Sequence, residues 1–147
     1  SNLSCELIAD GIHVHPAVLE LTSKVKSVDE IILVTDAIEA AGLGDGKYEL
    51  GGQEVIVKNG SASLEDGTLA GSILTIDQAL RNMLNFTSLK LPEVIKMISL
   101  NPAKLLNLDH KIGQIKKGLK ADLVILDREL QIIEVFINGE SKYKRYI

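Results

Sequence analysis

The chain has 147 residues, 46% of them hydrophobic, and a formal net charge of -4 at pH 7. This length and apolar content predict one globular domain and exclude a disordered chain, but a complete (β/α)8 barrel takes about 250 residues. The acidic balance argues against a nucleic-acid partner, which requires clustered Lys and Arg, and no apolar stretch approaches the roughly 18 residues of a membrane span, so no membrane partner is expected.

The first residues and the single cysteine bear on where the protein is found. Residues 1–2, Ser1 and Asn2, resemble a tag remnant and are set aside. An apolar strand follows almost at once, so we expect a fragment of something longer. Cys5 has no partner for a disulfide or a metal cluster, and no signal peptide leads the chain, so a cytoplasmic location is expected.

The first predicted unit is a strand, a polar loop, a helix and a second strand. Residues 3–9 favour a strand, and Pro16 suits the first turn of a helix with apolar residues at helical spacing. Residues 31–34 are apolar and mostly β-branched, as in a strand buried on both faces. Such strands are expected to be parallel, so the loops that follow them open at the same edge of the sheet.

Asp36 follows the second strand, where α/β folds place their chemistry, and is the first catalytic candidate. The alternative is an Asp that caps the next turn. His13 and His15 have a spacing seen in metal sites, but such a site needs a third ligand, for which Asp36 is the candidate. We expect His15 in solvent at the helix start and His13 facing the crevice, where it can donate to an anionic or hydroxyl-rich ligand.

Residues of about 45–66 form a predicted β-hairpin excursion between a strand and its helix. Strands are expected at 47–50, 53–58 and 61–64, with an Asn59-Gly60 turn between the last two. Residues 67–72 then form a small-residue loop that leads into a helix N-terminus, which either binds ligand oxygens through backbone N–H groups or is only a structural turn. Either Ser72 or Thr75 is placed to cap that helix, and Thr75 and Gln78 have capping-box spacing.

The remaining residues predict helices and then a small antiparallel sheet. After the helix that follows Thr75, Pro92 begins another, with residues 94, 95 and 98 facing inward. Asn101-Pro102 ends that helix and begins a short one through Leu108. Strands are expected at 112–115, 121–126, 132–137 and 143–147, with an Asn-Gly turn at 138–139, which suffices for a small sheet.

Four segments together carry a family resemblance. In chain order they are Asp10-Gly11-Ile12-His13-Val14, Val34-Thr35-Asp36-Ala37, Glu65-Asp66-Gly67-Thr68-Leu69-Ala70-Gly71-Ser72 and Gly118-Leu119-Lys120-Ala121-Asp122-Leu123-Val124. They closely resemble the C-terminal part of the N-acetylglucosamine-6-phosphate deacetylases, a family of the amidohydrolase superfamily. The last segment identifies only the superfamily, and the first three are narrower. The resemblance covers nearly the whole chain.

The resemblance implies an α/β fold, namely the C-terminal portion of a (β/α)8 amidohydrolase barrel plus a small antiparallel β-sandwich segment. Residues 3–111 would supply the last strands and helices of the barrel, together with the excursion. Residues 112–147 would supply the C-terminal strands of the small β domain.

The resemblance also implies the chemistry. In that family the aspartate matching Asp36 is the general base that activates metal-bound water against the acetamide of N-acetylglucosamine 6-phosphate, and it then protonates the leaving amine. The products are glucosamine 6-phosphate and acetate. In members with two metals, this carboxylate is also a metal ligand. The implied substrate-binding residues are Asp10, Gly11, Ile12, His13, Leu69, Ala70 and Gly71.

The family's principal metal ligands, a glutamate and two histidines, lie upstream of this sequence, and His15 matches none of them. We therefore expect a divalent metal, zinc or iron, in the full-length enzyme, but none bound by this chain, which alone would be inactive. The alternatives are another amidohydrolase and a non-catalytic sugar-phosphate-binding or regulatory module. Uncovered strand edges predict self-association, with a homodimer as the expected assembly.

Overall fold

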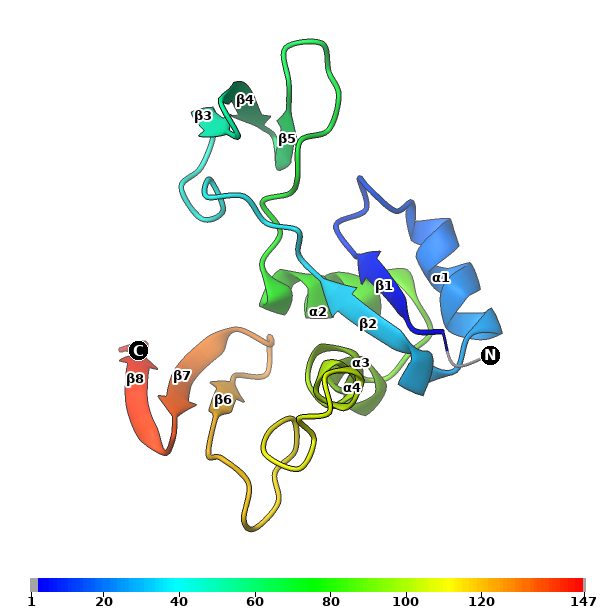
Figure 1. The fold of residues 1–147 in the computed structure, drawn as a ribbon, viewed down its shortest axis with the longest axis vertical. Helices are drawn as coiled ribbons and strands as arrows, with labels where there is room; N and C mark the ends of the chain where they lie inside the picture. Colours follow the sequence, from blue (N-terminus) through cyan, green and yellow to red (C-terminus); the bar gives the residue numbers. More distant parts are fainter. Residues whose placement is uncertain (1–2, 147) are drawn as a thin grey trace.

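The computed structural model describes residues 3–146, so the tag remnant predicted at residues 1–2 lies outside the described residues. The described residues form three small sheets, which Figure 1 shows with the helices beside them. One sheet is parallel and two are antiparallel. In chain order the strands are β1 (Cys5–Ile8), β2 (Ile31–Val34), β3 (Gly46–Leu50), β4 (Gln53–Lys58), β5 (Ser61–Ser63), β6 (Leu123–Leu126), β7 (Ile132–Ile137) and β8 (Glu140–Lys144).

The N-terminal unit follows the predicted order of strand, helix and strand. Helix α1 (Pro16–Val25) and a short 3-10 turn (Val28–Glu30) connect β1 to β2. The two strands are parallel, as predicted, with Cys5 opposite Ile31 and Ile8 opposite Val34. The first strand is shorter than the predicted 3–9, because it ends before Asp10, whose side chain organises a turn.

Three further helices, α2 (Ile76–Phe86), α3 (Leu91–Ile98) and α4 (Leu100–Leu105), pack against β2. The main core lies between the helices and the parallel sheet and includes one residue of α1, and its fully buried side chains include Leu19, Ile31, Leu80, Met83, Val94 and Met97. Each such side chain contributes about 1.5–3 kcal/mol of transfer free energy. Ile95 was predicted to face inward but is exposed, since the third helix buries Val94 and Met97 instead.

The predicted excursion is a separate three-stranded sheet, β3–β4–β5, at the top of Figure 1. Val55, Val57 and Ala62 form its small core with residues 38, 40 and 70. The predicted Asn59-Gly60 turn joins β4 to β5, with φ of 52° and 84°. Positive φ at both central residues identifies a type I′ turn, whose twist matches that of the two strands.

Of two helix predictions, the N-cap position at Thr75 is confirmed without its capping box, and the helix end at Leu108 is wrong. Thr75 is the N-cap residue of α2 but makes no side-chain capping bond, and the Gln78 side chain donates to Asn82 at 2.7 Å. The fourth helix ends at Leu105 rather than Leu108, since Asn107 adopts a left-handed conformation with φ of 56°. Within residues 3–146, no helix is long and apolar enough to cross a membrane.

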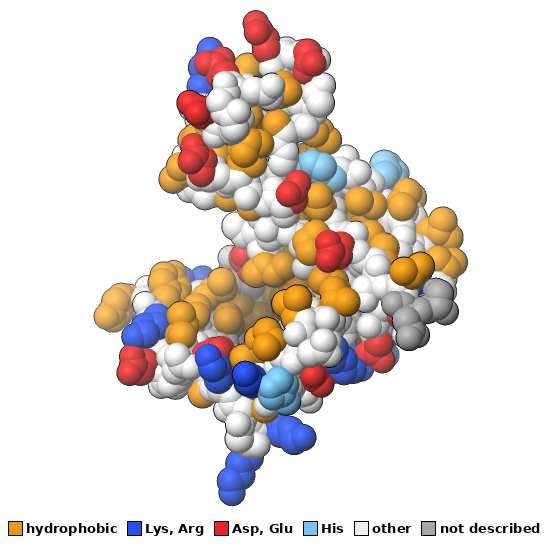
Figure 2. All heavy atoms as spheres, viewed as in Figure 1, with side chains coloured by type: hydrophobic (Ala, Val, Ile, Leu, Met, Phe, Trp, Pro, Cys, Tyr) orange, Lys and Arg blue, Asp and Glu red, His pale blue; other side chains and the backbone are white. Residues whose placement is uncertain are grey.

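The C-terminal sheet, β6–β7–β8, is antiparallel and contains the predicted Asn138-Gly139 turn. Residues 112–115 form no strand, contrary to prediction: Gly113 has φ of 87°, and a Cβ there would lie 2.8 Å from Ala103. The last strand occupies 140–144 rather than 143–147, because it begins directly after the turn. Figure 2 shows the molecule hollowed between this sheet and the excursion.

Candidate functional site

The carboxyl ends of β1 and β2 bring two acidic residues to one edge of the parallel sheet. Ile8 and Val34 are paired, and Asp10 and Asp36 each lie two residues beyond that pair. Asp36 is exposed, so it is not locked into the core, and it has a left-handed backbone with φ of 49°. Such a conformation is uncommon for a residue other than glycine and persists only when neighbouring structure holds it.

The turn after β1 is organised by the Asp10 carboxylate. Its Oδ1 accepts the backbone N–H groups of Ile12 at 2.9 Å and His13 at 2.8 Å, and its Oδ2 lies 2.6 Å from Nδ1 of His13. Burial alone would raise the pKa of Asp10, but these hydrogen bonds and the charge interaction with His13 hold it below its ordinary value. The turn therefore carries an ionised carboxylate paired with an imidazole.

Gly11 and Ile12 complete this turn. Gly11 has φ of 78°, and a Cβ there would lie 3.3 Å from the Phe86 ring, so both the conformation and the close approach favour glycine. Ile12 is exposed beside it. An apolar side chain and an imidazole thus stand together at the end of the first strand.

Ser72 fastens the end of β2 to the segment that returns from the excursion. The buried Ser72 hydroxyl donates to the carbonyl of Thr35 and accepts the Leu74 N–H at 3.0 Å. The Ser72 N–H donates to the Asp36 carbonyl at 2.8 Å, and its own carbonyl accepts the Ile38 N–H at 2.9 Å. These bonds hold the backbone of Asp36 from both sides.

The segment 69–71 lies next to this clamp. Ala70 is buried and donates to the Ala62 carbonyl at 3.0 Å, whereas Leu69 is exposed. Gly71 has φ of 66°, and a Cβ there would lie 2.5 Å from Cγ2 of Ile38. The segment is therefore fixed between the excursion and the end of β2, with the Leu69 side chain available to a ligand.

Asn82 of α2 is a candidate-site residue that the sequence did not indicate. Its Nδ2 donates to the Ala9 carbonyl at 2.8 Å and so holds the end of β1. The only signal in the sequence is that Asn82, a polar residue, lies next to the apolar stripe of α2. An open cavity of about 240 Å³ lies here, lined by Asp10, Gly60, Ile73, Leu74, Thr75, Gln78 and Asn82.

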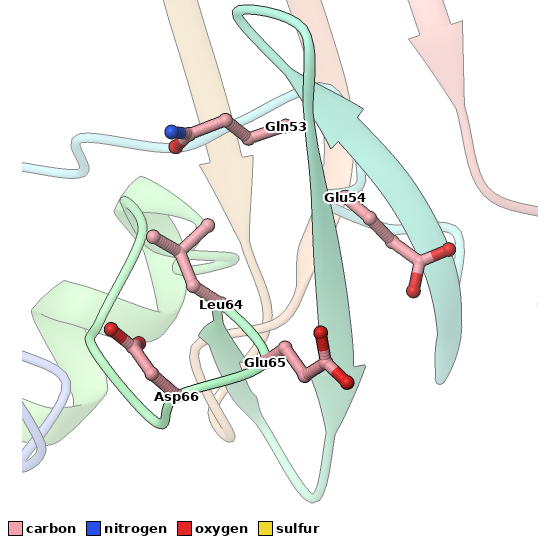
Figure 3. Close-up of a pocket in the computed structure, with 5 residues that line it drawn as sticks. All are labelled: Gln53, Glu54, Leu64, Glu65 and Asp66. Carbon is pink, nitrogen blue, oxygen red and sulfur yellow. The ribbon is translucent and has the colours of Figure 1, made fainter.

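A larger hollow of about 540 Å³ lies on the excursion, lined by Gln53, Glu54, Leu64, Glu65 and Asp66 (Figure 3). In the close-up, Glu54 and Glu65 point to one side of the strands, and Leu64 and Asp66 lie on the other. Three acidic side chains repel an anionic ligand, so this hollow is a poor site for a phosphate.

The described residues do not form a metal site. Across residues 3–146, no three His, Cys, Asp or Glu side chains come together in a way that could hold an ion. Nδ1 of His13 is engaged by Asp10, and Nδ1 of His15 accepts the Ala17 N–H at 3.2 Å as the cap of α1. The exposed helix-start position predicted for His15 is confirmed, and the His-x-His pair is committed to other contacts.

A parallel β-α-β unit with an aspartate and an imidazole in the loops after its strands defines an α/β protein with polar side chains where such folds place their sites. The sequence profile of the amidohydrolase family matches residues 2–142. The chain belongs to that family, as the resemblance indicated.

Individual relatives are similar over almost the whole chain. The N-acetylglucosamine-6-phosphate deacetylase of Lysinibacillus sphaericus is 48% identical over 140 residues, which are 95% of this chain and 36% of the relative. An Escherichia coli K12 protein, provisionally named N-acetylgalactosamine-6-phosphate deacetylase, is 44% identical over 92% of this chain and 80% of its own length. The crystal structure of the Thermotoga maritima N-acetylglucosamine-6-phosphate deacetylase matches with a TM-score of 0.91 and 44% identity, over 97% of this chain and 39% of that one. The chain thus spans little more than a third of two of these proteins.

Proposed function

We propose that the chain is the C-terminal part of an amino-sugar phosphate deacetylase. The complete protein would hydrolyse the acetamide of N-acetylglucosamine 6-phosphate to glucosamine 6-phosphate and acetate. The observation that carries the proposal is the joining of three loop segments at one sheet edge, through the parallel β1–β2 pair and the bridge between Ala37 and Ser72. Similarity to deacetylases over almost the whole chain supports it.

In this proposal Asp36 is the general base and then the general acid. Its carboxylate accepts a proton as water attacks the acetamide carbonyl, and it returns that proton to the nitrogen as the C–N bond breaks. The exposed position of Asp36 and the backbone clamp through Ser72 suit this role. His13, Ile12 and the 69–71 segment would contact the sugar phosphate.

The rest of the catalytic machinery would come from outside this chain. Amidohydrolase-family deacetylases are generally metal-dependent, and we propose zinc or iron in the complete protein, with Asp36 as a ligand only if two ions are present. We also propose that residues 3–111 belong to a (β/α)8 barrel and residues 112–147 to a small β-sandwich, in a cytoplasmic homodimer.

The test compares the complete protein with this chain alone. The complete protein should release acetate from N-acetylglucosamine 6-phosphate, with N-acetylgalactosamine 6-phosphate as the competing substrate. Asp36→Asn in the complete protein should lower kcat by about 10²–10⁴-fold, because the proton acceptor is lost. Glu39→Gln, which alters an exposed acid in the same loop, is the matched control and should leave kcat unchanged.

Two results would contradict the proposal. Robust hydrolysis by the isolated chain with added zinc would mean that a complete site lies within it. Binding of the sugar phosphate by the complete protein without acetate release would instead favour a non-catalytic binding module.

A further inference from the structure

The two histidines of the first loop have opposite hydrogen-bond partners at the same ring atom. Nδ1 of His13 faces an oxygen of Asp10, and Nδ1 of His15 faces the N–H of Ala17. A carboxylate only accepts hydrogen bonds and a backbone N–H only donates them. The proton must therefore lie on Nδ1 in His13 and, whenever its ring is neutral, on Nε2 in His15.

We propose that Asp10 is a positioning residue that fixes the tautomer and orientation of His13, so that Nε2 is the ring atom presented to the ligand. His15 holds the opposite tautomer and serves only as the cap of α1. For the identity of the ligand this inference rests on the proposed function, but the tautomer assignment stands apart from it.

The surroundings of Asp10 support a role through His13 rather than direct ligand contact. Both carboxylate oxygens are occupied, and the side chain is 9% exposed, against 19% for His13. Within residues 3–146, Nε2 of His13 has no hydrogen-bond partner. With Nδ1 held by Asp10, Nε2 accepts from a hydroxyl when the ring is neutral and donates to an anionic oxygen when it is charged.

Long-range ¹H–¹⁵N NMR of the full chain tests the assignment, at a pH where titration shows that the rings are neutral. We expect the Nδ1–H pattern for His13 and the Nε2–H pattern for His15. His110, which is exposed, supplies the averaged reference, and single His→Gln variants assign the signals.

The variant Asp10→Asn should move only the His13 pattern toward a mixture, because an amide donates as well as accepts. Asp29→Asn, at an exposed carboxylate elsewhere, is the control and should change the NMR pattern of none of the three histidines. An Nε2–H pattern for His13 in the unaltered chain would overturn the proposal, and that measurement needs no variant. An unchanged His13 in Asp10→Asn would overturn it as well.

Kinetics in the complete protein separate this inference from the proposed function. Asp10→Asn should raise KM for the amino-sugar phosphate about tenfold with little change in kcat, because a hydrogen bond to substrate loses its orientation. A KM for Asp10→Asn equal to that of the unaltered complete protein would refute the positioning role. If the tautomers are as assigned but the complete protein releases no acetate, the proposed function fails and the Asp10–His13 assignment stands.

Discussion

The attachment of the 69–71 segment to the end of β2 predicts that alanine destabilises the protein more at Gly71 than at Gly67, which lies in the same loop. Gly67 and Gly71 have φ of 85° and 66°, so alanine at either position incurs the left-handed penalty of about 1–2 kcal/mol. A Cβ at Gly67 meets nothing within 4 Å, whereas one at Gly71 would lie 2.5 Å from Cγ2 of Ile38. Overpacking of this kind adds about 1–3 kcal/mol to the loss of unfolding free energy.

Gly67→Ala should therefore lower the free energy of unfolding by about 1–2 kcal/mol, and Gly71→Ala by about 2–5 kcal/mol. Urea denaturation followed by circular dichroism measures both, and unchanged m-values would show that the comparison is valid. The double variant Gly71→Ala with Ile38→Ala removes the clashing methyl group. In that background the Gly71 substitution should cost less than in the unaltered chain, and only the tight contact of the added Cβ with the Asp36 carbonyl oxygen, at 3.2 Å, would separate it from Gly67→Ala. Equal losses for the two single glycine variants would refute the close contact.

Two further predictions concern charge and assembly. Burial alone would raise the pKa of Asp77, but hydrogen bonds from Thr75 and Arg81 hold that pKa below its ordinary value of 3.8. The ionised Asp77 side chain therefore stabilises the fold above pH 3.8, and this stabilisation is lost as the pH falls further. Asp77→Asn should lower the unfolding free energy near neutral pH by less than about 1 kcal/mol, and a difference from the unaltered chain that persists at the lowest pH would contradict this. The exposed face of α1, with Val18, Leu21 and Val25, and the unpaired outer edges of the β1–β2 sheet within residues 3–146 predict self-association, which a clean monomer in concentrated sedimentation runs would contradict.

The sequence predicted the features that depend on neighbouring residues. Both Asn-Gly turns form where the dipeptides occur, because those residues tolerate positive φ at adjacent positions. The parallel unit follows from two apolar runs separated by a helix, and the excursion follows from closely spaced strands and turns. Periodicity was less reliable for burial: Val18 and Val25 match the helical spacing but are exposed, since spacing defines a face without showing what covers it.

The contacts that hold the candidate site could not be predicted in this way. The Ser72 hydroxyl bonds a carbonyl 37 positions away, and the Asn82 amide bonds one 73 positions away. Both acceptors are backbone carbonyls, which are present at every position and leave no signal in the side-chain pattern. The left-handed conformation of Asp36 has no local signal either, since its own neighbours contain no turn dipeptide. The sequence indicated which residues were candidates but not how they are held.

The placement of the excursion explains how an insertion can sit beside the candidate site without loosening it. Closing a longer loop costs little additional entropy, because each doubling of length adds only about 0.6 kcal/mol. The excursion has its own small core, and its chain returns as a bridge between Ala37 and Ser72. Ser72 then holds the end of β2, and Asn82 of the following helix holds the end of β1. The two strand ends are therefore set by one continuous segment, residues 72–82, so a change in the register of that segment would displace the Asp36 and Asp10 backbones together.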